Sequence, residues 1–166
     1  LAVRENTNEL GSVNLQSTKL FNANTPVLTN GIVAPWMINA TRRTFLTYDV
    51  NLGYQNAPFI AGTPTAGGGN SFLSGVGGTD VVQFAGGWGD TTLTGIKNVY
   101  ALRVDEETST NDMVFDGGQI NIWSGGLILG SDDGNRVNFD TTDIYFGDGR
   151  IGKVGECHER HLCGIA

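Results

Sequence analysis

The chain has 166 residues, a net charge of −7 and a charged fraction of 16%, which is low beside the roughly 25% that is usual in globular domains. A length of this order suits one domain, and no apolar run approaches the about 20 residues that a membrane-spanning helix needs. The acidic balance argues against nucleic-acid binding and against attachment to an anionic membrane, because both require basic side chains.

Glycine accounts for 25 residues, about twice its ordinary share of ~7%. Frequent Gly, Asn and Thr favour a chain that turns often, and no 3.6-residue period marks a helix. We therefore expect an all-β protein. Residues 1–16 (LAVRENTNELGSVNLQ) are expected to end a preceding coil or to cap one, and the start at Leu1 without Met indicates a mature or excised segment.

Residues 29–54 carry the aromatic side chains of Trp36, Phe45 and Tyr48. We interpret them as core or coil-edge packing, and a platform that stacks on sugars is the alternative. The triplet Asn39-Ala40-Thr41 fits the N-glycosylation pattern, although one such match in a chain rich in Asn and Thr is close to chance.

Residues 55–78 (QNAPFIAGTPTAGGGNSFLSGVGG) have two prolines and a Gly-Gly-Gly run. This composition predicts a loop that leaves the regular structure. A plain connector is the simpler interpretation, and a binding loop is the alternative.

Residues 86–95 (GGWGDTTLTG) nearly match a calcium-binding nonapeptide. The aspartate, Asp90, arrives one position early and the pattern does not recur. Because calcium requires about 6–8 oxygen ligands, we interpret the segment as a Gly-rich turn with Trp88 at its edge.

The stretch 98–130 holds three short apolar runs, separated by Gly-Gly or by Asp, Asn, Ser and Thr. The runs are residues 99–104 (VYALRV), 119–123 (QINIW) and 126–130 (GLILG). The first two alternate with period two, which is typical of strands, and the breaks predict turns. Such strands cannot bury a face alone, so we expect successive coils to stack around one core. Leu102, Ile120 and Leu127 are expected to share that core.

These runs resemble the coil signature of autotransporter-associated β-strand repeat proteins, which are large bacterial surface proteins. Residues 99–104, 118–122 (GQINI) and 124–129 (SGGLIL) carry this match. A second match, in residues 28–36 (LTNGIVAPW) and 44–49 (TFLTYD), is similar to long planctomycete and verrucomicrobial members.

The two matches together cover roughly residues 21 to 149. The resemblance implies an exported protein with a right-handed parallel β-helix, that is, a β-solenoid of short coils with a Gly/Pro-rich loop excursion. It implies no catalytic residues. We expect a solenoid domain at 1–150, which could be a segment of a longer passenger region, and a separate tail or cap at 151–166.

Five aspartates gather after the central coils. Paired carboxylates can act as acid and base on glycosidic bonds, but aspartates at strand ends ordinarily bond their own backbone in turns. We favour the turn role. The five are Asp132, Asp133, Asp140, Asp143 and Asp148.

The tail concentrates both cysteines and both histidines of the chain within seven residues: Cys157, His158, His161 and Cys163. A Cys157–Cys163 disulfide would fit an oxidising exterior. A zinc or copper site formed by all four is the second interpretation, although adjacent Cys157 and His158 leave little backbone to wrap a tetrahedron. A free segment, or one that pairs with another chain, is the third.

We predict a non-catalytic structural or adhesive protein of the bacterial cell surface or an extracellular fibre, with no cofactor. No nucleophile elbow or phosphate loop is present, and no His outside the tail offers a general base. Open solenoid ends would let copies join head to tail into a homo-oligomer or fibre. The alternatives are a carbohydrate-active β-helix enzyme or a phage tailspike-like polysaccharide-binding protein, and a calcium-stabilised binding module.

Overall fold

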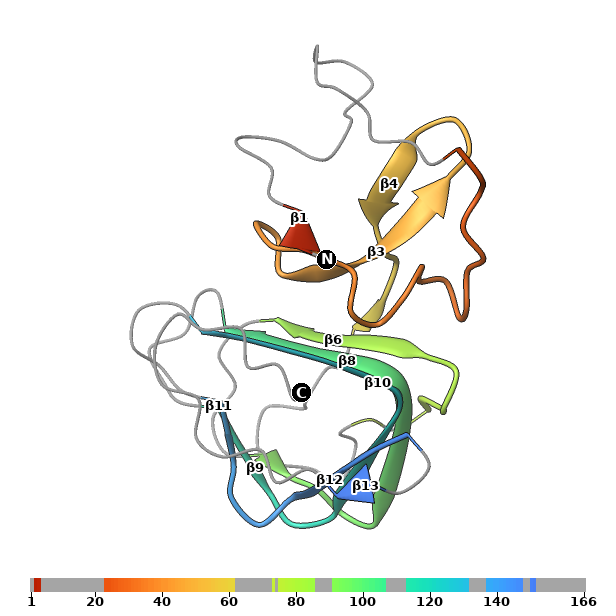
Figure 1. Cartoon of the computed structure of the whole chain (residues 1–166). Helices are drawn as coiled ribbons and strands as arrows, with labels where there is room; N and C mark the ends of the chain where they lie inside the picture. Colours follow the sequence, from red (N-terminus) through yellow and green to blue (C-terminus); the bar gives the residue numbers. More distant parts are fainter. Residues whose placement is uncertain are drawn as a thin grey trace. The chain divides into compact units, whose positions relative to one another are not determined.

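A computed structural model describes residues 2–3, 23–61, 73, 75–85, 91–106, 113–131, 137–147 and 150–151. In these ranges the chain forms strands and turns and no helix, so the all-β prediction is confirmed. The chain divides into two compact units, Leu1–Pro58 and Phe59–Ala166, which we call the N-terminal and C-terminal units (Figure 1).

The N-terminal unit contains one mixed sheet in the order β1-β2-β3-β4. Strand β1 runs parallel to β2, whereas β2 with β3 and β3 with β4 are antiparallel. The strands are β1 (Ala2–Val3), β2 (Ile38–Asn39), β3 (Thr44–Asp49) and β4 (Gly53–Asn56).

Apolar side chains of this unit are buried, and the side chain of Asp49 stabilises the turn between β3 and β4. Ile32 and Leu46 are fully buried and Phe45 is 1% exposed. In the turn between β3 and β4, the Asp49 carboxylate accepts hydrogen bonds from the backbone N–H groups of residues 51 and 52 at 2.8 and 3.0 Å. Gly53 then adopts a φ of 78°, which only glycine reaches at little cost.

The C-terminal unit contains a six-stranded sheet in the order β13-β12-β10-β8-β6-β5. All neighbours are parallel except β12 and β13. The strands are β5 (Ile60–Ala61), β6 (Val81–Ala85), β8 (Ile96–Glu106), β10 (Gln119–Ser131), β12 (Asp143–Phe146) and β13 (Arg150–Ile151).

A second, fully parallel sheet has the order β11-β9-β7. Its strands are β7 (Thr91–Thr92), β9 (Met113–Asp116) and β11 (Val137–Phe139). Along the sequence, strands of the two sheets alternate from β6 to β12. Figure 1 shows β9 and β11 on the side of this unit opposite to the line of β6, β8 and β10.

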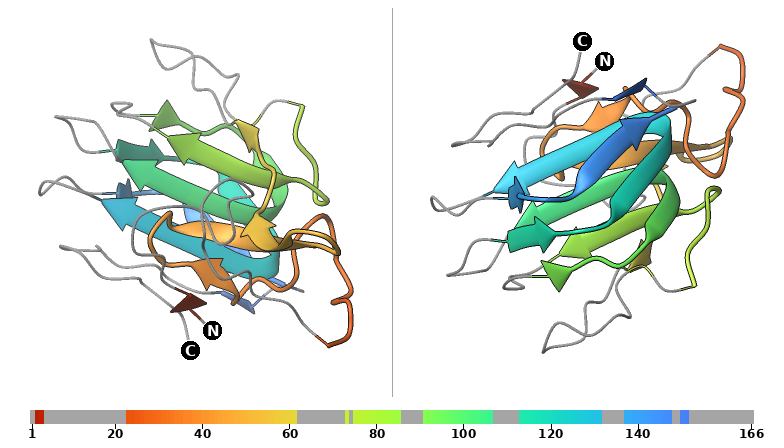
Figure 2. Two further views of the ribbon diagram at one scale, coloured as in Figure 1. Left: turned by 90° about the horizontal axis from the view of Figure 1, so that it is seen from above. Right: turned by 90° about the horizontal axis from the view of Figure 1, so that it is seen from below.

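The long strands β8 and β10 bend together and pair along two segments. Residues 119–122 of β10 pair with 96–99 of β8, and residues 126–131 pair with 101–106, with a register shift after Ile122. Both strands follow the same bent path (Figures 1 and 2). The turn that the Gly125-Gly126 pair predicted is therefore wrong: two predicted runs form one strand, which bends where the ladder shifts register between Ile122 and Gly126, and glycine accommodates such an irregularity.

The parallel strands of this unit pair residues that lie 20 to 25 positions apart in the sequence, and we call a segment of this length a repeat. The segments FDGGQINI (115–122) and FDTTDIYF (139–146) lie in register, with Phe115 paired to Phe139 and Gln119 to Asp143. Side-chain hydrogen bonds between successive repeats join residues 23 to 25 positions apart. The strands are thus stacked in sequence order with a nearly constant spacing.

Apolar side chains of both sheets form one core in the C-terminal unit. Leu102 and Ile120 are fully buried, and Leu127, in register with Leu102, packs against the same cluster, so the shared core predicted for these three is confirmed. Phe115 stacks on Phe139 at 4.8 Å and meets Phe84 edge-on at 6.1 Å. Each fully buried side chain of this size contributes about 1.5–3 kcal/mol to folding.

Candidate functional site

The corner before β8, β10 and β12 is built from backbone bonds between successive repeats. The N–H groups of Gln119 and Asp143 donate to the carbonyls of Gly95 and Gly118 at 3.0 and 3.2 Å. Gly118 has a φ of +62°, and a Cβ there would lie 2.9 Å from the Gly95 carbonyl oxygen. The corner therefore requires glycine at position 118, for its backbone angle and for its close approach.

Aspartate and threonine side chains form hydrogen bonds at the same corner. The Gly117 N–H donates to Thr141 Oγ1 at 2.7 Å, and this hydroxyl donates to the Asp116 carboxylate. Thr142 Oγ1 donates to the Gly117 carbonyl at 2.7 Å. These contacts bind one repeat to the next.

Two of the five predicted aspartates lie near this corner. Asp140 and Asp143 are exposed, and their backbone N–H groups donate to carbonyls of the preceding repeat. Asp140 lies in a bend, as the turn role predicts, whereas Asp143 is the first residue of strand β12. Asp132, Asp133 and Asp148 lie outside the described residues.

The outward side of the β8, β10 and β12 segments carries a polar face. Ile120 and Ile122 of β10 are fully buried, so the alternate positions point away from the core. Because paired residues in parallel strands project to the same side, this outer face has two rows. They are Ile96, Gln119 and Asp143, and Asn98, Asn121 and Tyr145.

Amide side chains are hydrogen-bonded to one another along the outer face. Asn121 Nδ2 donates to Asn98 Oδ1 at 2.9 Å, and Gln119 Nε2 donates to Asn121 Oδ1 at 2.5 Å. Each amide has two N–H donors and two acceptor lone pairs. The two bonds fix the orientation of the amides and use only part of this capacity, and the three side chains are half-buried.

Trp123 occupies the next alternate position of β10 and is 50% exposed. Its indole lies against the backbone of Gly78, because a Cβ at that glycine would be 2.8 Å from both indole Cδ1 and Nε1. The ring can therefore lie this close only because residue 78 has no side chain. The sequence showed Trp123 at the end of an alternating run, but nothing in the sequence paired it with position 78.

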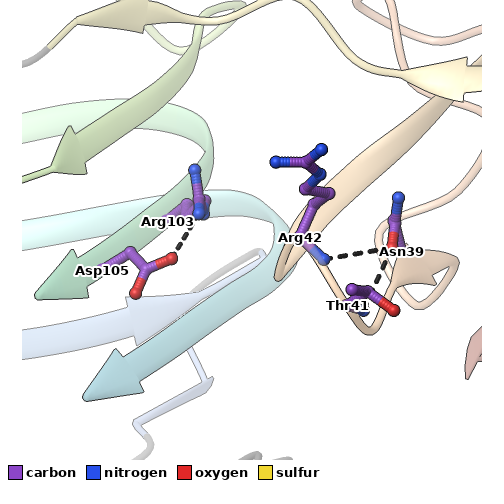
Figure 3. A network of polar contacts seen from close by, with 5 residues as sticks. All are labelled: Asn39, Thr41, Arg42, Arg103 and Asp105. Atoms are coloured by element: carbon purple, nitrogen blue, oxygen red, sulfur yellow. Dashed lines mark hydrogen bonds and ion pairs between the residues drawn. The ribbon is translucent and has the colours of Figure 1, made fainter. Parts of the chain in front are cut away.

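A buried ion pair lies on the other segment of β8 (Figure 3). Arg103 is 6% exposed and Asp105 is fully buried, and the guanidinium donates to the carboxylate. Gln83 pairs in register with Arg103 and is 7% exposed. These residues alternate with Leu102 and Val104, so this segment of β8 is buried on both sides, which an alternating sequence does not predict.

In the N-terminal unit, Asn39 has a structural role (Figure 3). It is fully buried, donates from Nδ2 to Asn56 Oδ1 at 3.0 Å, and accepts from the N–H groups of Thr41 and Arg42 at 3.0 and 3.1 Å. An amide nitrogen used in this way is not accessible to a glycosyl donor. The glycosylation pattern is thus a chance match in the folded chain.

The three aromatic residues of this unit do not form a common platform. Phe45 is in the core and Trp36 is 71% exposed. Tyr48 is half-buried and meets Tyr54 edge-on at 5.1 Å. Packing is therefore confirmed for Phe45, and the sugar-stacking alternative for the trio is not supported.

Several predicted features lie outside the described residues. They are the tail residues Cys157, His158, His161 and Cys163, residues 62–72 and 74 of the Gly/Pro-rich loop, and residues 86–90 with Trp88 and Asp90. In the part of the chain that is described, no group of three or more His, Cys, Asp or Glu side chains could hold a metal ion. The same ranges contain no helix long and apolar enough to cross a membrane.

Comparison with known proteins gave no match to a family model, to a curated protein or to a solved structure.

Proposed function

We propose that the C-terminal unit is a right-handed parallel β-helix and that it serves as a non-catalytic structural or adhesive segment of a bacterial surface protein or extracellular fibre. The observation that carries the proposal is the stacking of parallel strands in sequence order around one core, with hydrogen-bonded residues 23 to 25 positions apart. Each repeat is one coil, and neighbouring coils supply the second half of its core.

A stack of this kind suits a load-bearing or spacing role. Its stiffness comes from continuous ladders and from aromatic contacts between coils, such as Phe115 on Phe139. The low charged fraction and the frequent Gly, Asn and Thr fit an exported β protein, as does the resemblance to autotransporter-associated repeats. We place the protein outside the cell or on the outer-membrane surface.

The proposal includes association of copies end to end. At one edge of the six-stranded sheet, β5 presents Ile60, which is 45% exposed, next to Phe59, which is 49% exposed. An apolar edge strand is a template for another chain. A contact between this edge and the opposite end of a second copy is heterologous, so it would extend into a fibre.

The test is sedimentation velocity across a hundredfold range of protein concentration, with negative-stain images of the same samples. We expect rods that lengthen with concentration, and Ile60→Lys should shorten them because it places a charge on the edge. Val50→Lys is the matched control, because Val50 is 62% exposed and belongs to the N-terminal unit. Compact monomers at every concentration would overturn the proposal.

A further inference from the structure

We infer that the outer face of β8, β10 and β12, together with Trp123, binds an uncharged polysaccharide. The inference deepens the adhesive part of the proposed function and rests on it. The observation that carries it is a fixed row of amides next to a half-exposed indole that lies against a glycine.

The amide row matches the chemistry of sugar hydroxyl groups. A hydroxyl both donates and accepts hydrogen bonds, and so does each carboxamide. Neighbouring strands lie about 4.8 Å apart, which is close to the length of one sugar ring. Asn98 and Asn121, and Tyr145 in the same row, could therefore contact successive sugars along the stack.

The indole of Trp123 supplies the apolar contact. Aromatic rings provide a large flat surface with little conformational freedom to lose, and the C–H face of a sugar ring is apolar. Because Gly78 lies against the Cδ1–Nε1 edge of the ring, the indole does not need to be ordered when a ligand arrives. Preorganisation of this kind lowers the cost of binding.

Charge selects the class of polysaccharide. Asp143 is the one ionisable carboxylate in the two rows of the outer face, which contain no Lys or Arg. The whole chain carries a net charge of −7. An acidic polymer would be repelled over a long range, whereas a neutral glycan would not.

The experiment is native affinity electrophoresis in gels that contain soluble hydroxyethylcellulose, mixed-linkage β-glucan or galactomannan, with alginate as the acidic comparison. We expect at least one neutral polymer to retard the protein and alginate to leave its mobility unchanged. Trp123→Ala should weaken binding roughly tenfold, because it removes the stacking surface. Gly78→Ala should also weaken binding, because the new methyl group displaces the ring.

Trp36→Ala is the matched control, since Trp36 is 71% exposed and lies in the other unit. The mobility of this variant in each gel should equal that of the wild type. Thermal melts followed by circular dichroism show whether each variant is folded, and Trp123→Ala removes a half-exposed side chain, so it should fold. No retardation in any neutral gel, retardation by alginate alone, or equal retardation of Trp123→Ala and wild type would overturn the inference.

Failure of this inference is distinct from failure of the proposed function. Rods in the sedimentation experiment without retardation in any gel would remove the glycan face and leave the structural role. Retarded monomers would support the glycan face and remove the end-to-end association.

Discussion

The two compact units reach an all-β structure by different kinds of pairing. In the N-terminal unit, β3 and β4 are neighbours in sequence, and side chains of Asp49 and Asn39 fix the adjacent turns. In the C-terminal unit, parallel strands pair with the next repeat, and backbone bonds and Gly118 fix the corner. The first unit should therefore be sensitive to single polar side chains, and the second to core columns and to glycine.

The largest effect is expected from the aromatic column of the C-terminal unit. Phe115→Ala removes a fully buried ring that contacts both Phe84 and Phe139, and should lower the free energy of unfolding by about 3–5 kcal/mol. Amide hydrogen exchange measured by mass spectrometry should show faster exchange in β7 and β11 as well as in β9, because both neighbours pair with β9.

Phe45→Ala is the control, because Phe45 lies in the antiparallel strands of the N-terminal unit. Phe45 is 1% exposed, so the loss of stability in its own unit should be similar, but faster exchange should be confined to β2, β3 and β4. Exchange in Phe115→Ala that accelerates in β9 alone would contradict the stacked arrangement.

A smaller loss of stability is expected from alanine substitutions at Gly95 and Gly118. Comparing the two separates the cost of the backbone angle from the cost of the close approach at the corner. Gly95 and Gly118 have φ values of +68° and +62°, but a Cβ at Gly95 meets nothing within 4 Å, whereas one at Gly118 meets the Gly95 carbonyl oxygen at 2.9 Å. Gly95→Ala should cost about 1–2 kcal/mol for the left-handed backbone. Gly118→Ala should cost about 1–3 kcal/mol more, because backbone atoms must move apart.

Urea unfolding of the two variants, with one probe for both, measures this difference. Equal losses of stability would mean that successive repeats do not approach each other closely at position 118. That result would argue against stacking at this corner.

The fold class was predictable because alternation is a local signal. The alternating run at 99–104 is part of β8, and apolar Leu102 and Ile120 are in the core. The spacing between repeats is also present in the sequence, since FDGGQINI recurs as FDTTDIYF after 24 positions, but the match is weak. Five of those eight positions differ, so the repeat is visible mainly once Phe115 and Phe139 are seen to stack.

The roles of three sets of residues were less predictable, for physical reasons. Trp123 and Gly78 are in contact although they lie far apart in the sequence, and no local pattern marks this contact. Arg103 and Asp105 read as the solvent side of an alternating strand, yet both are buried. Asn39 matched a surface modification pattern and is a core hydrogen-bonding group. In each case long-range packing, not local pattern, decided the role.

The smallest effect expected is in the N-terminal unit, at Asn39. Asn39→Ala removes the acceptor for two backbone N–H groups and the donor to Asn56, and should destabilise this unit by about 1–2 kcal/mol. Asn56→Ala is the matched control, because it removes the one bond between the two side chains and leaves the turn at Thr41 and Arg42 bonded. We expect hydrogen exchange at residues 40–43 to accelerate in Asn39→Ala and much less in Asn56→Ala. Equal acceleration in both variants would mean that the contact between the strands, and not the turn, holds this unit, and the contrast with the glycine-fixed corner of the other unit would then be lost.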